Sequence, residues 1–306
     1  MAEDTTLHNE YHEDFHDTCL DYIPKEERLK IWNDNMKITD EQFLAMDNTE
    51  FRARVRERSH HTLEIQVYHA AYRNLTLSPT QADYTKHLLQ LWEQKGLGKN
   101  EPEYRYASFL IDAADKLARG EQVDLTPYKP TPVTPQIEQD FFTVLKERRS
   151  VREFKWDKDV PDELIDKILE AGLWAAHGCN VQSIRYVVVK EKTSPGWFKG
   201  SDVPGGPVHI VVLQDMRCYK ANSFTPRRNR LLDAGAAAQN IVLATHAVGL
   251  EGVWLTFSEE MNTRLRKNFN LPDYVRLVTY VDIGWGDQTP HPPLRWPVKD
   301  TVLGRF

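Results

Sequence analysis

Hydrophobic and charged residues recur at helical spacing through the first part of the chain, and no convincing strand pattern occurs there. Three helices are predicted, over 51–72, 81–93 and 103–118. Ser78 and Pro79 mark the start of the second helix, because proline suits the first helical position, and Gly120 closes the third. Residues 1–125 are therefore expected to form a helical domain, whose role the sequence does not indicate.

After residue 136, the pattern changes to an alternation of helices and short apolar strands. Helices are predicted over 136–148, 160–176 and 233–248, and strands over 186–189, 208–213, 252–257 and 277–283. Few of these strands alternate cleanly between apolar and polar residues, so the sheet is expected to be covered on more than one face. The predicted class is α+β.

A proline-rich segment separates the two parts of the chain. Residues 126–135 contain four prolines, each of which fixes φ and removes a backbone donor, so an extended linker is predicted. The expected organisation is a helical domain over 1–125, the linker over 126–135 and a second domain over 136–306.

Composition and charge narrow the function classes. The chain has 306 residues, 41% hydrophobic and 27% charged, as in ordinary globular proteins. A formal net charge of −6 argues against nucleic acid as a partner, and no apolar run approaches the roughly 18 residues of a membrane span. The acidic N-terminus does not resemble a secretory signal, and Cys19, Cys179 and Cys218 are too widely spaced for a disulfide framework. We expect a cytoplasmic protein that binds neither nucleic acid nor membrane.

Four segments carry candidate chemistry, and the first is rich in arginine. Arg148, Arg149, Ser150 and Arg152 combine planar guanidinium donors with a hydroxyl, a set suited to phosphate. Taken alone, such a run of charges is more often a solvated basic surface.

The second segment is the loop 175–182, predicted to lie between a helix and a strand. Gly178 permits a close backbone approach, and Asn180 and Gln182 both donate and accept hydrogen bonds, as recognition of a heterocycle with amide-like edges requires. By itself the loop is an ordinary turn.

The third and fourth segments lie nearer the C-terminus. Small residues over 233–240, followed by 249–256, favour either a close helix contact or a buried core helix. Residues 290–297 form a proline-stiffened arm that could wrap a partner subunit and deliver Arg295 to a distant site.

In this order and spacing, the four segments resemble the nitroreductase family of FMN enzymes over residues 140–306. The family pattern is an Arg-Arg-Ser-Val-Arg-like start, a small-residue loop ending in Asn-x-Gln, an alanine-rich Ala-x-Gln-Asn helix before Gly-Leu, and a late proline-arginine tail. The resemblance implies a nitroreductase-like fold: a mixed sheet flanked by helices in an intertwined homodimer, with FMN bound at the subunit interface.

Carried over to this chain, the resemblance implies a distinct role for each segment. Arg148, Arg149 and Ser150 would hold the FMN phosphate and ribityl chain, joined by Arg295, while Asn180 and Gln182 would meet the ribityl or isoalloxazine edge. Residues Trp254, Leu255 and Thr256 would lie along the flavin, with Thr256 as a donor near N5.

The loop departs from the family pattern, which begins with Pro-Ser and continues after Gln with Pro-Trp. Here Ala176-His177 and Ser183-Ile184-Arg185 stand instead. His177 is therefore interpreted either as an acid or substrate contact beside the flavin, which makes it a candidate catalytic residue with Thr256, or as a buried structural histidine. Cys179 has no evident base nearby in the sequence and is interpreted as structural.

The expected activity is transfer of hydride from NAD(P)H through FMN to a nitro, quinone, enone or halogenated aromatic acceptor, in ping-pong order. No Gly-x-Gly-x-x-Gly follows a predicted strand, so a separate nicotinamide-binding domain is not expected. Substrate choice is assigned to 217–230, where Tyr219, Lys220, Phe224 and Arg227 are candidate contacts, although the segment is also compatible with solvated surface.

Two alternatives stay open. One is a flavin-dependent dehydrogenase or oxidase that tailors a small molecule. The other is a non-catalytic flavin-binding or sensing protein whose N-terminal domain recruits a partner.

Histidines in the N-terminal part raise the question of a metal. His8, His12 and His16 would share one face of a helix, but the acidic residues around them equally suit a polar, frayed terminus. His60, His61, Glu64 and His69 raise a similar question. No metal site is predicted.

Overall fold

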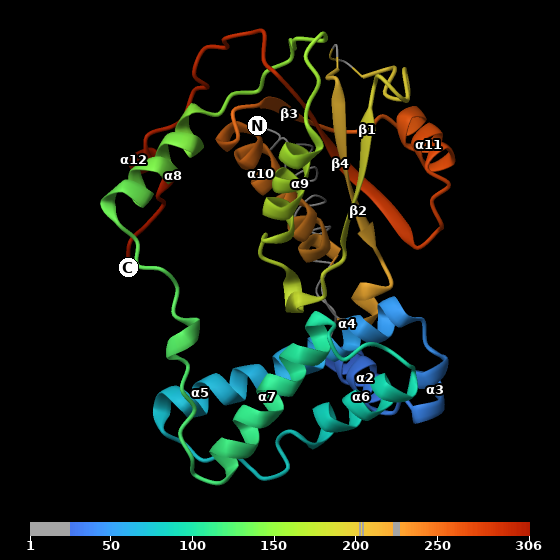
Figure 1. Cartoon of the computed structure of the whole chain (residues 1–306), viewed down its shortest axis with the longest axis vertical. Helices are drawn as coiled ribbons and strands as arrows, with labels where there is room; N and C mark the ends of the chain where they lie inside the picture. The colour runs from blue at the N-terminus through green and yellow to red at the C-terminus, as the bar shows by residue number, and fades with distance from the viewer. Residues whose placement is uncertain (1–24, 202, 204, 223–226) are drawn as a thin grey trace, which may run out of the picture.

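The computed structural model describes residues 25–201, 203, 205–222 and 227–306. Residues 25–118, called the helical region below, contain helices and turns but no strand in their described part. The helices are α2 (Lys25–Met36), α3 (Asp40–Ala45), α4 (Asn48–Arg58), α5 (Ile65–Arg73), α6 (Asp83–Gln94) and α7 (Pro102–Ala118) (Figure 1). A π-helix, Ser59–Glu64, joins α4 to α5 within the segment predicted as one helix over 51–72.

Local capping and an apolar core explain these helices. Asp47 caps α4 by accepting hydrogen bonds from the backbone of Thr49 and Glu50, at 2.8 and 3.3 Å. Phe51 and Trp92 are fully buried, and their rings lie 6.1 Å apart where α4 packs against α6. The helical region therefore has a core of its own.

A four-stranded antiparallel sheet forms the centre of the second part of the chain. The strands are β1 (Ile184–Lys190), β2 (Val208–Asp215), β3 (Glu251–Leu255) and β4 (Val275–Gly284), in the order β1-β2-β4-β3. An isolated parallel bridge joins Ser150 to Gly252 beside β3. All eight residues of β2 are buried, which explains its run of β-branched and aliphatic residues.

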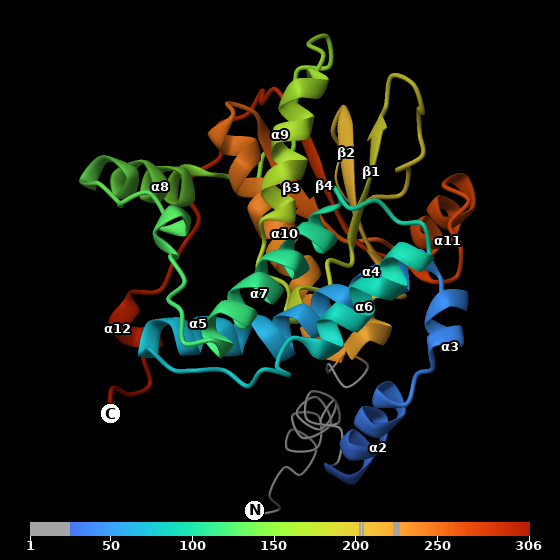
Figure 2. The same cartoon turned by 60° about the horizontal axis from the view of Figure 1, so that its bottom comes forward.

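Helices cover both faces of this sheet, as the sequence predicts. Ile210 and Val212 pack with α9 (Asp162–Leu173) and α10 (Arg227–Ala247). The alternate residues Val211 and Leu213 pack on the other face, with α11 (Glu259–Asn268). The fold is α+β, with the sheet between helical layers (Figures 1 and 2).

The helical region contacts the sheet region through α4. Ala53 of α4 lies in one buried cluster with Val181, Cys218 and Tyr219. Arg56 donates from Nη2 to the carbonyl oxygen of Val181 at 2.9 Å. The loop after α9 and the turn after β2 therefore both lie against the N-terminal part of the chain.

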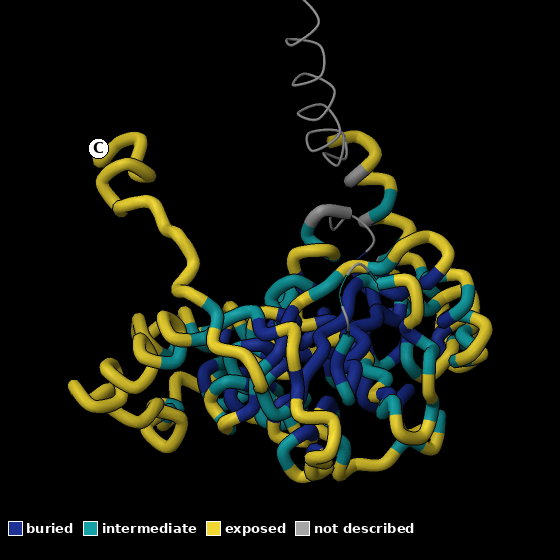
Figure 3. The backbone as a smooth tube through the Cα atoms, turned by 90° about the horizontal axis from the view of Figure 1, so that it is seen from above, coloured by how far each residue is buried: buried dark blue, intermediate teal, exposed yellow. Residues whose placement is uncertain are grey.

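Two segments lie largely outside these cores. Helix α8 (Pro135–Glu147) has an apolar face but buries none of its residues. Residues 287–306, which include α12 (Val298–Thr301), are almost entirely exposed and extend away from the body as the arm that ends at the C-terminus (Figure 3). Helix α8 contacts α10, but much of its apolar face stays exposed.

The sequence predicts most helices and strands, with errors at their ends. Helix α9 ends at Leu173 rather than 176, because Trp174 leaves the helical conformation. Helix α10 begins at Arg227 rather than 233, and α11 was not predicted. A 3₁₀ turn, Thr126–Tyr128, interrupts the segment predicted to be extended. None of the helices in the described residues is both long and apolar enough to cross a membrane.

Candidate functional site

The arginine-rich segment enters the sheet region directly beside β3. The backbone N–H of Val151 donates to the carbonyl oxygen of Gly252 at 3.1 Å, which fixes Ser150 next to the start of the strand. A Cβ atom on Gly252 would lie 2.6 Å from the carbonyl oxygen of Asp282 in β4, so glycine is needed at this position for the close pairing of β3 with β4. Arg149 donates to the backbone oxygens of Lys146 and Arg148, at 2.7 and 3.0 Å.

Arg148 and Arg295 interact although 147 positions separate them in the sequence. Partial burial lowers the pKa of Arg148, and the nearby positive charge of Arg295 lowers it further, whereas Glu251 acts in the opposite direction. Arg295 itself lies on the exposed C-terminal arm. Arg295 thus lies within electrostatic range of Arg148, and like charges that repel each other favour the binding of an anion nearby.

The predicted flavin-facing residues follow along β3. Trp254 is 41% exposed, and its indole N–H donates to the hydroxyl of Thr279 at 2.5 Å. Leu255 is half-buried, and Thr256 is exposed directly after the strand. This edge of the sheet therefore presents a fixed aromatic ring and a hydroxyl group to solvent.

The loop 177–182 has an unusual backbone. Cys179, Asn180 and Gln182 all have positive φ angles, of 51°, 49° and 51°, a region in which residues other than glycine are uncommon. The N–H of Gly178 donates to Asp233 Oδ1 of α10 at 2.8 Å, and Gln182 donates to the side chain of Asn180 at 3.3 Å. The exposed side chains of Asn180 and Gln182 are thus paired on a constrained loop.

His177 points into the protein. Its side chain is 8% exposed, and Nε2 lies 3.4 Å from Asp233 Oδ2. The same nitrogen accepts from the backbone N–H of Ser183 at 3.2 Å. Burial lowers the pKa of His177, although Asp233 acts in the opposite direction, so a neutral imidazole fits this position. These contacts favour the buried, structural interpretation of His177.

The two halves of the predicted site lie at opposite ends of α10. Gly178 is bonded to Asp233 near the start of the helix, whereas a Cβ atom on Gly252 would contact Thr245 near its end. Twelve residues of helix span about 18 Å, at 1.5 Å per residue. Within one chain, Asn180 and Gln182 therefore do not meet Arg148 and Ser150.

Comparisons with known proteins find similarity in the same part of the chain. The model of the nitroreductase family matches residues 145–196 and 195–285. A protein of Methanothermobacter thermautotrophicus with the provisional name NADH dehydrogenase/NAD(P)H nitroreductase is 31% identical over 158 residues, which cover 49% of this chain and 80% of the relative. The chain belongs to the nitroreductase family.

Other nitroreductases are similar over the same half. A protein of Archaeoglobus fulgidus with the same provisional name is 31% identical over 145 residues, covering 45% of this chain and 80% of the relative. A solved nitroreductase from Desulfovibrio desulfuricans, in complex with FMN, is 25% identical, with a TM-score of 0.44, over 57% of this chain and 98% of its own. The predicted family and its oxidoreductase class are confirmed. The helical region lies outside the family match.

The predicted substrate segment of this nitroreductase needs correction at Tyr219. Its side chain is 2% exposed, and its hydroxyl donates to Asp233 at 2.7 Å and accepts from Ser183 and Gln214, both at 2.9 Å. A hydroxyl with three internal partners holds the core together and does not contact a substrate directly. The burial of Tyr219 could not be predicted from the sequence, because an aromatic residue in a predicted loop gives no sign that it is buried.

The structure says less about the other three predicted substrate contacts, Lys220, Phe224 and Arg227. Lys220 is exposed and forms an ion pair with Glu50 of α4 at 3.1 Å. Phe224 and the side chain of Arg227 lie outside the described residues, as do His8, His12 and His16.

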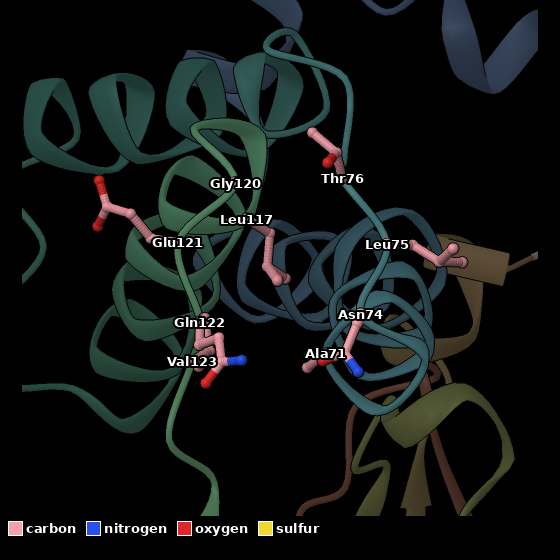
Figure 4. A pocket seen from close by; sticks show the side chains of 9 residues that line it. All are labelled: Ala71, Asn74, Leu75, Thr76, Leu117, Gly120, Glu121, Gln122 and Val123. Atoms are coloured by element: carbon pink, nitrogen blue, oxygen red, sulfur yellow. The ribbon is translucent and has the colours of Figure 1, made fainter.

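A cavity of about 580 Å³ lies between the helical region and residues 145–285, the part of the chain that matches the nitroreductase family. Pro102 of α7 forms part of its wall, with Trp174, His177, Asn180 and Gln182 from the loop side. A smaller cavity, of about 220 Å³, lies within the helical region between the ends of α5 and α7 (Figure 4). The described residues include no cluster of three or more histidine, cysteine, aspartate or glutamate side chains arranged to hold a metal.

Proposed function

We propose that this nitroreductase binds FMN and transfers electrons from NADH or NADPH to a small organic acceptor. Family membership over residues 145–285 supports the reaction class. The observation that carries the proposal is the position of Arg148 and Arg295, whose guanidinium groups repel each other at the edge of β3. We further propose that the chain is organised as domains 1–125 and 136–306, joined by the linker 126–135.

The donor set fits FMN. A phosphate group is a dianion that would neutralise two adjacent guanidinium groups, and Arg149 and Ser150 would add donors. The bridge to Gly252 holds Ser150 beside the start of β3. The exposed face of Trp254 and the hydroxyl of Thr256 would lie along a planar ring system.

FMN, when bound, would supply the redox chemistry by accepting hydride from the nicotinamide and delivering it to the acceptor. The protein would contribute binding, orientation and charge. Arg148 and Arg295 would hold the phosphate, and the bond from Trp254 to Thr279 would fix the indole so that the ring edge stays open to ligands. The donor and the acceptor would occupy the same cleft in turn, which gives ping-pong kinetics.

A complete site requires a second copy of the chain. Asn180 and Gln182 would reach Arg148 only across a subunit interface, since the two groups lie at opposite ends of an α10 segment about 18 Å long. The apolar face of α8 supports a homodimer, because Ile137, Phe141 and Leu145 are 46%, 56% and 39% exposed. Leu294 and Trp296 of the arm are 93% and 77% exposed and would also be covered.

We propose nitro, quinone, enone or halogenated aromatic compounds as acceptors. The uncharged and apolar groups around the shared cavity, such as Trp174 and Leu173, suit aromatic molecules. A nicotinamide donor and two free cysteines fit a reducing cytoplasm, where we place the reaction.

The first test is the visible spectrum of the purified protein, with mass identification of any released chromophore. A flavin spectrum that yields FMN is expected. Protein that stays colourless after FMN is added would overturn the proposal.

The second test concerns the phosphate site. Arg148→Ala and Arg295→Ala are each expected to weaken FMN binding at least tenfold in a fluorescence titration, because each removes a charge-assisted bond worth about 1.5–3 kcal/mol. Arg119→Ala is the matched control, since Arg119 is paired with Glu121 in the helical region. Unchanged affinity in both site variants would disprove the assignment.

A further inference from the structure

Cys179 lies in a cluster of side chains that the reaction proposed above does not use. Its Sγ is 4.0 Å from His61 Nε2, and His61 Nδ1 is 2.8 Å from Glu57 Oε1. Asn222 donates from Nδ2 to the same sulfur at 2.9 Å. The contacts run from a thiol to an imidazole to a carboxylate. This is the arrangement of a nucleophile, its base and the group that orients the base.

The electrostatics of the cluster favour a charged pair. Burial alone would raise the pKa of Glu57, but hydrogen bonds from His61 and Arg58 lower it, so the carboxylate is ionised. Hydrogen bonds to Cys179 and Glu57 raise the pKa of His61 to about 10. A protonated imidazole beside a sulfur atom stabilises the thiolate, which is the reactive form of cysteine.

The backbone is irregular both at Cys179 and at His61. Cys179 has a φ of 51°, and His61 lies in the π-helix Ser59–Glu64, a feature often found at functional sites. Local strain at a cysteine and a π-helix at its histidine are independent of the hydrogen bonds. They indicate that the two side chains are held in place by the fold.

The cluster also has an unused acceptor and limited access. Asn222 is 2% exposed, and its Oδ1 has no hydrogen-bond partner within the described part of the chain. Cys179 is half-buried, and the His61 side chain is 37% exposed. The sulfur is therefore the part of the cluster that a small molecule can approach.

We propose that Cys179 is a reactive cysteine that is oxidised by hydrogen peroxide, with His61 as its proton donor. The sulfur attacks one peroxide oxygen, an S–O bond forms and the O–O bond breaks. The departing hydroxide takes the proton of the His61 imidazolium and leaves as water. Cys179 becomes a sulfenic acid, two electrons pass from sulfur to peroxide, and His61 becomes neutral. This step needs no bound flavin, so it is independent of the proposed function.

Cys218 provides an internal control. It is fully buried, and burial raises the pKa of its thiol. In the folded chain it should therefore react far more slowly than Cys179 with both peroxide and alkylating reagents.

The test treats the full chain with hydrogen peroxide and the sulfenic-acid reagent dimedone, followed by peptide mass spectrometry that separates the three cysteines. Labelling of Cys179 is expected to be at least tenfold faster than that of Cys218. Equal labelling of the two would overturn the proposal. Alkylation of Cys179 by iodoacetamide without any dimedone adduct would also overturn it, because the thiolate would then not react with peroxide.

A pH profile tests the role of His61. The charged groups around the pair are Glu57 and Arg58 of α4, with His60 and Glu64 on the π-helix. An ordinary thiol loses about tenfold in alkylation rate for each pH unit below its pKa near 8.5. The rate at Cys179 is expected to depend less steeply on pH in the wild type than in His61→Gln, because the variant lacks the imidazole beside the sulfur.

His61→Gln should restore the ordinary steep profile and lower the rate at pH 6 at least tenfold. His60→Gln is the matched control, because His60 bonds to Glu64 at 2.6 Å rather than to the cysteine. Circular dichroism and thermal unfolding establish that both variants are folded. An identical profile in the wild type and in His61→Gln would show that His61 does not control the thiol.

Discussion

Ser150 lies in parallel register beside Gly252, and the N–H of the next residue, Val151, donates to the Gly252 carbonyl oxygen at 3.1 Å. This contact joins the segment after α8 to β3. It also brings the arginines 148 and 149 to the edge of the sheet. Gly252 also lies where β3 pairs closely with β4, since a Cβ atom there would lie 2.6 Å from the Asp282 carbonyl oxygen.

Gly252→Ala should therefore destabilise the fold. Overpacking against backbone atoms, which cannot rotate away, is expected to cost about 1–3 kcal/mol in the free energy of unfolding, measured by urea denaturation. Gly98→Ala serves as the control, because its new Cβ would meet only the Glu101 side chain, at 3.8 Å. Equal stability of the two variants would mean that the sheet edge relaxes freely.

The sequence predicts the elements of this fold well, because their signals are local. The apolar run of β2 and the alanine-rich α10 are visible in composition and periodicity. The ends of helices depend on weaker contacts, and α9 stops at Leu173 although its glycine, Gly172, lies within the helix and no glycine or proline directly follows it. Helix α11 has a capping serine, Ser258, but a strongly charged surface that hides its two buried residues, Met261 and Leu265.

The arrangement of the candidate site is harder to predict from the sequence than the fold. Motif order identifies Arg148, Ser150 and Arg295, but no local pattern shows that α10 keeps them away from Asn180 in one chain. The base beside Cys179 comes from His61, which is 118 positions away in the sequence and outside the family match. Tertiary contacts of this kind appear only when the helical region packs against the loop.

Tyr219→Phe distinguishes a core residue from a substrate contact. Loss of the hydroxyl removes the bond to Asp233 and leaves Ser183 and Gln214 each without one partner. The variant should lose about 1–3 kcal/mol of stability, while KM for an aromatic acceptor stays within twofold of the wild type. Tyr72→Phe, at a side chain that is 73% exposed, should change neither quantity. A raised KM with unchanged stability would restore the original interpretation of Tyr219.

His177 should make the protein sensitive to acid. Burial lowers its pKa in the folded chain below the ordinary value of about 6.5, so the unfolded chain binds more protons as the pH falls. The stability that the neutral imidazole contributes is present above about pH 6.5 and is lost as the pH decreases towards the folded pKa.

His177→Gln cannot titrate, yet it can still accept from the N–H of Ser183. Between pH 7.5 and 5.5, the free energy of unfolding of the wild type should decrease more than that of the variant, by at most about 1.4 kcal/mol per pH unit. His291→Gln, in the exposed arm, should behave like the wild type. Parallel curves for wild type and His177→Gln would exclude a depressed pKa at His177.

Arg56 links the helical region to the loop of the candidate site. Its guanidinium group is bonded both to Glu103 of α7 and to the carbonyl oxygen of Val181, and the residue is 8% exposed. Arg56→Met keeps the apolar stem but leaves the Val181 carbonyl oxygen without this donor and removes one of the two guanidinium groups that bind Glu103. The expected loss is about 3 kcal/mol, at the lower end for a broken buried ion pair, because Arg52 still binds Glu103 at 2.9 Å.

Arg52→Met is the matched control for this linkage. Arg52 binds the same carboxylate, but its side chain is 34% exposed and does not contact the loop, so its loss should cost less. Hydrogen exchange over residues 178–183 separates the two effects, since only Arg56→Met should increase exchange there. If both variants loosen the loop equally, then the ion pair with Glu103, and not the bond to Val181, joins the helical region to the loop.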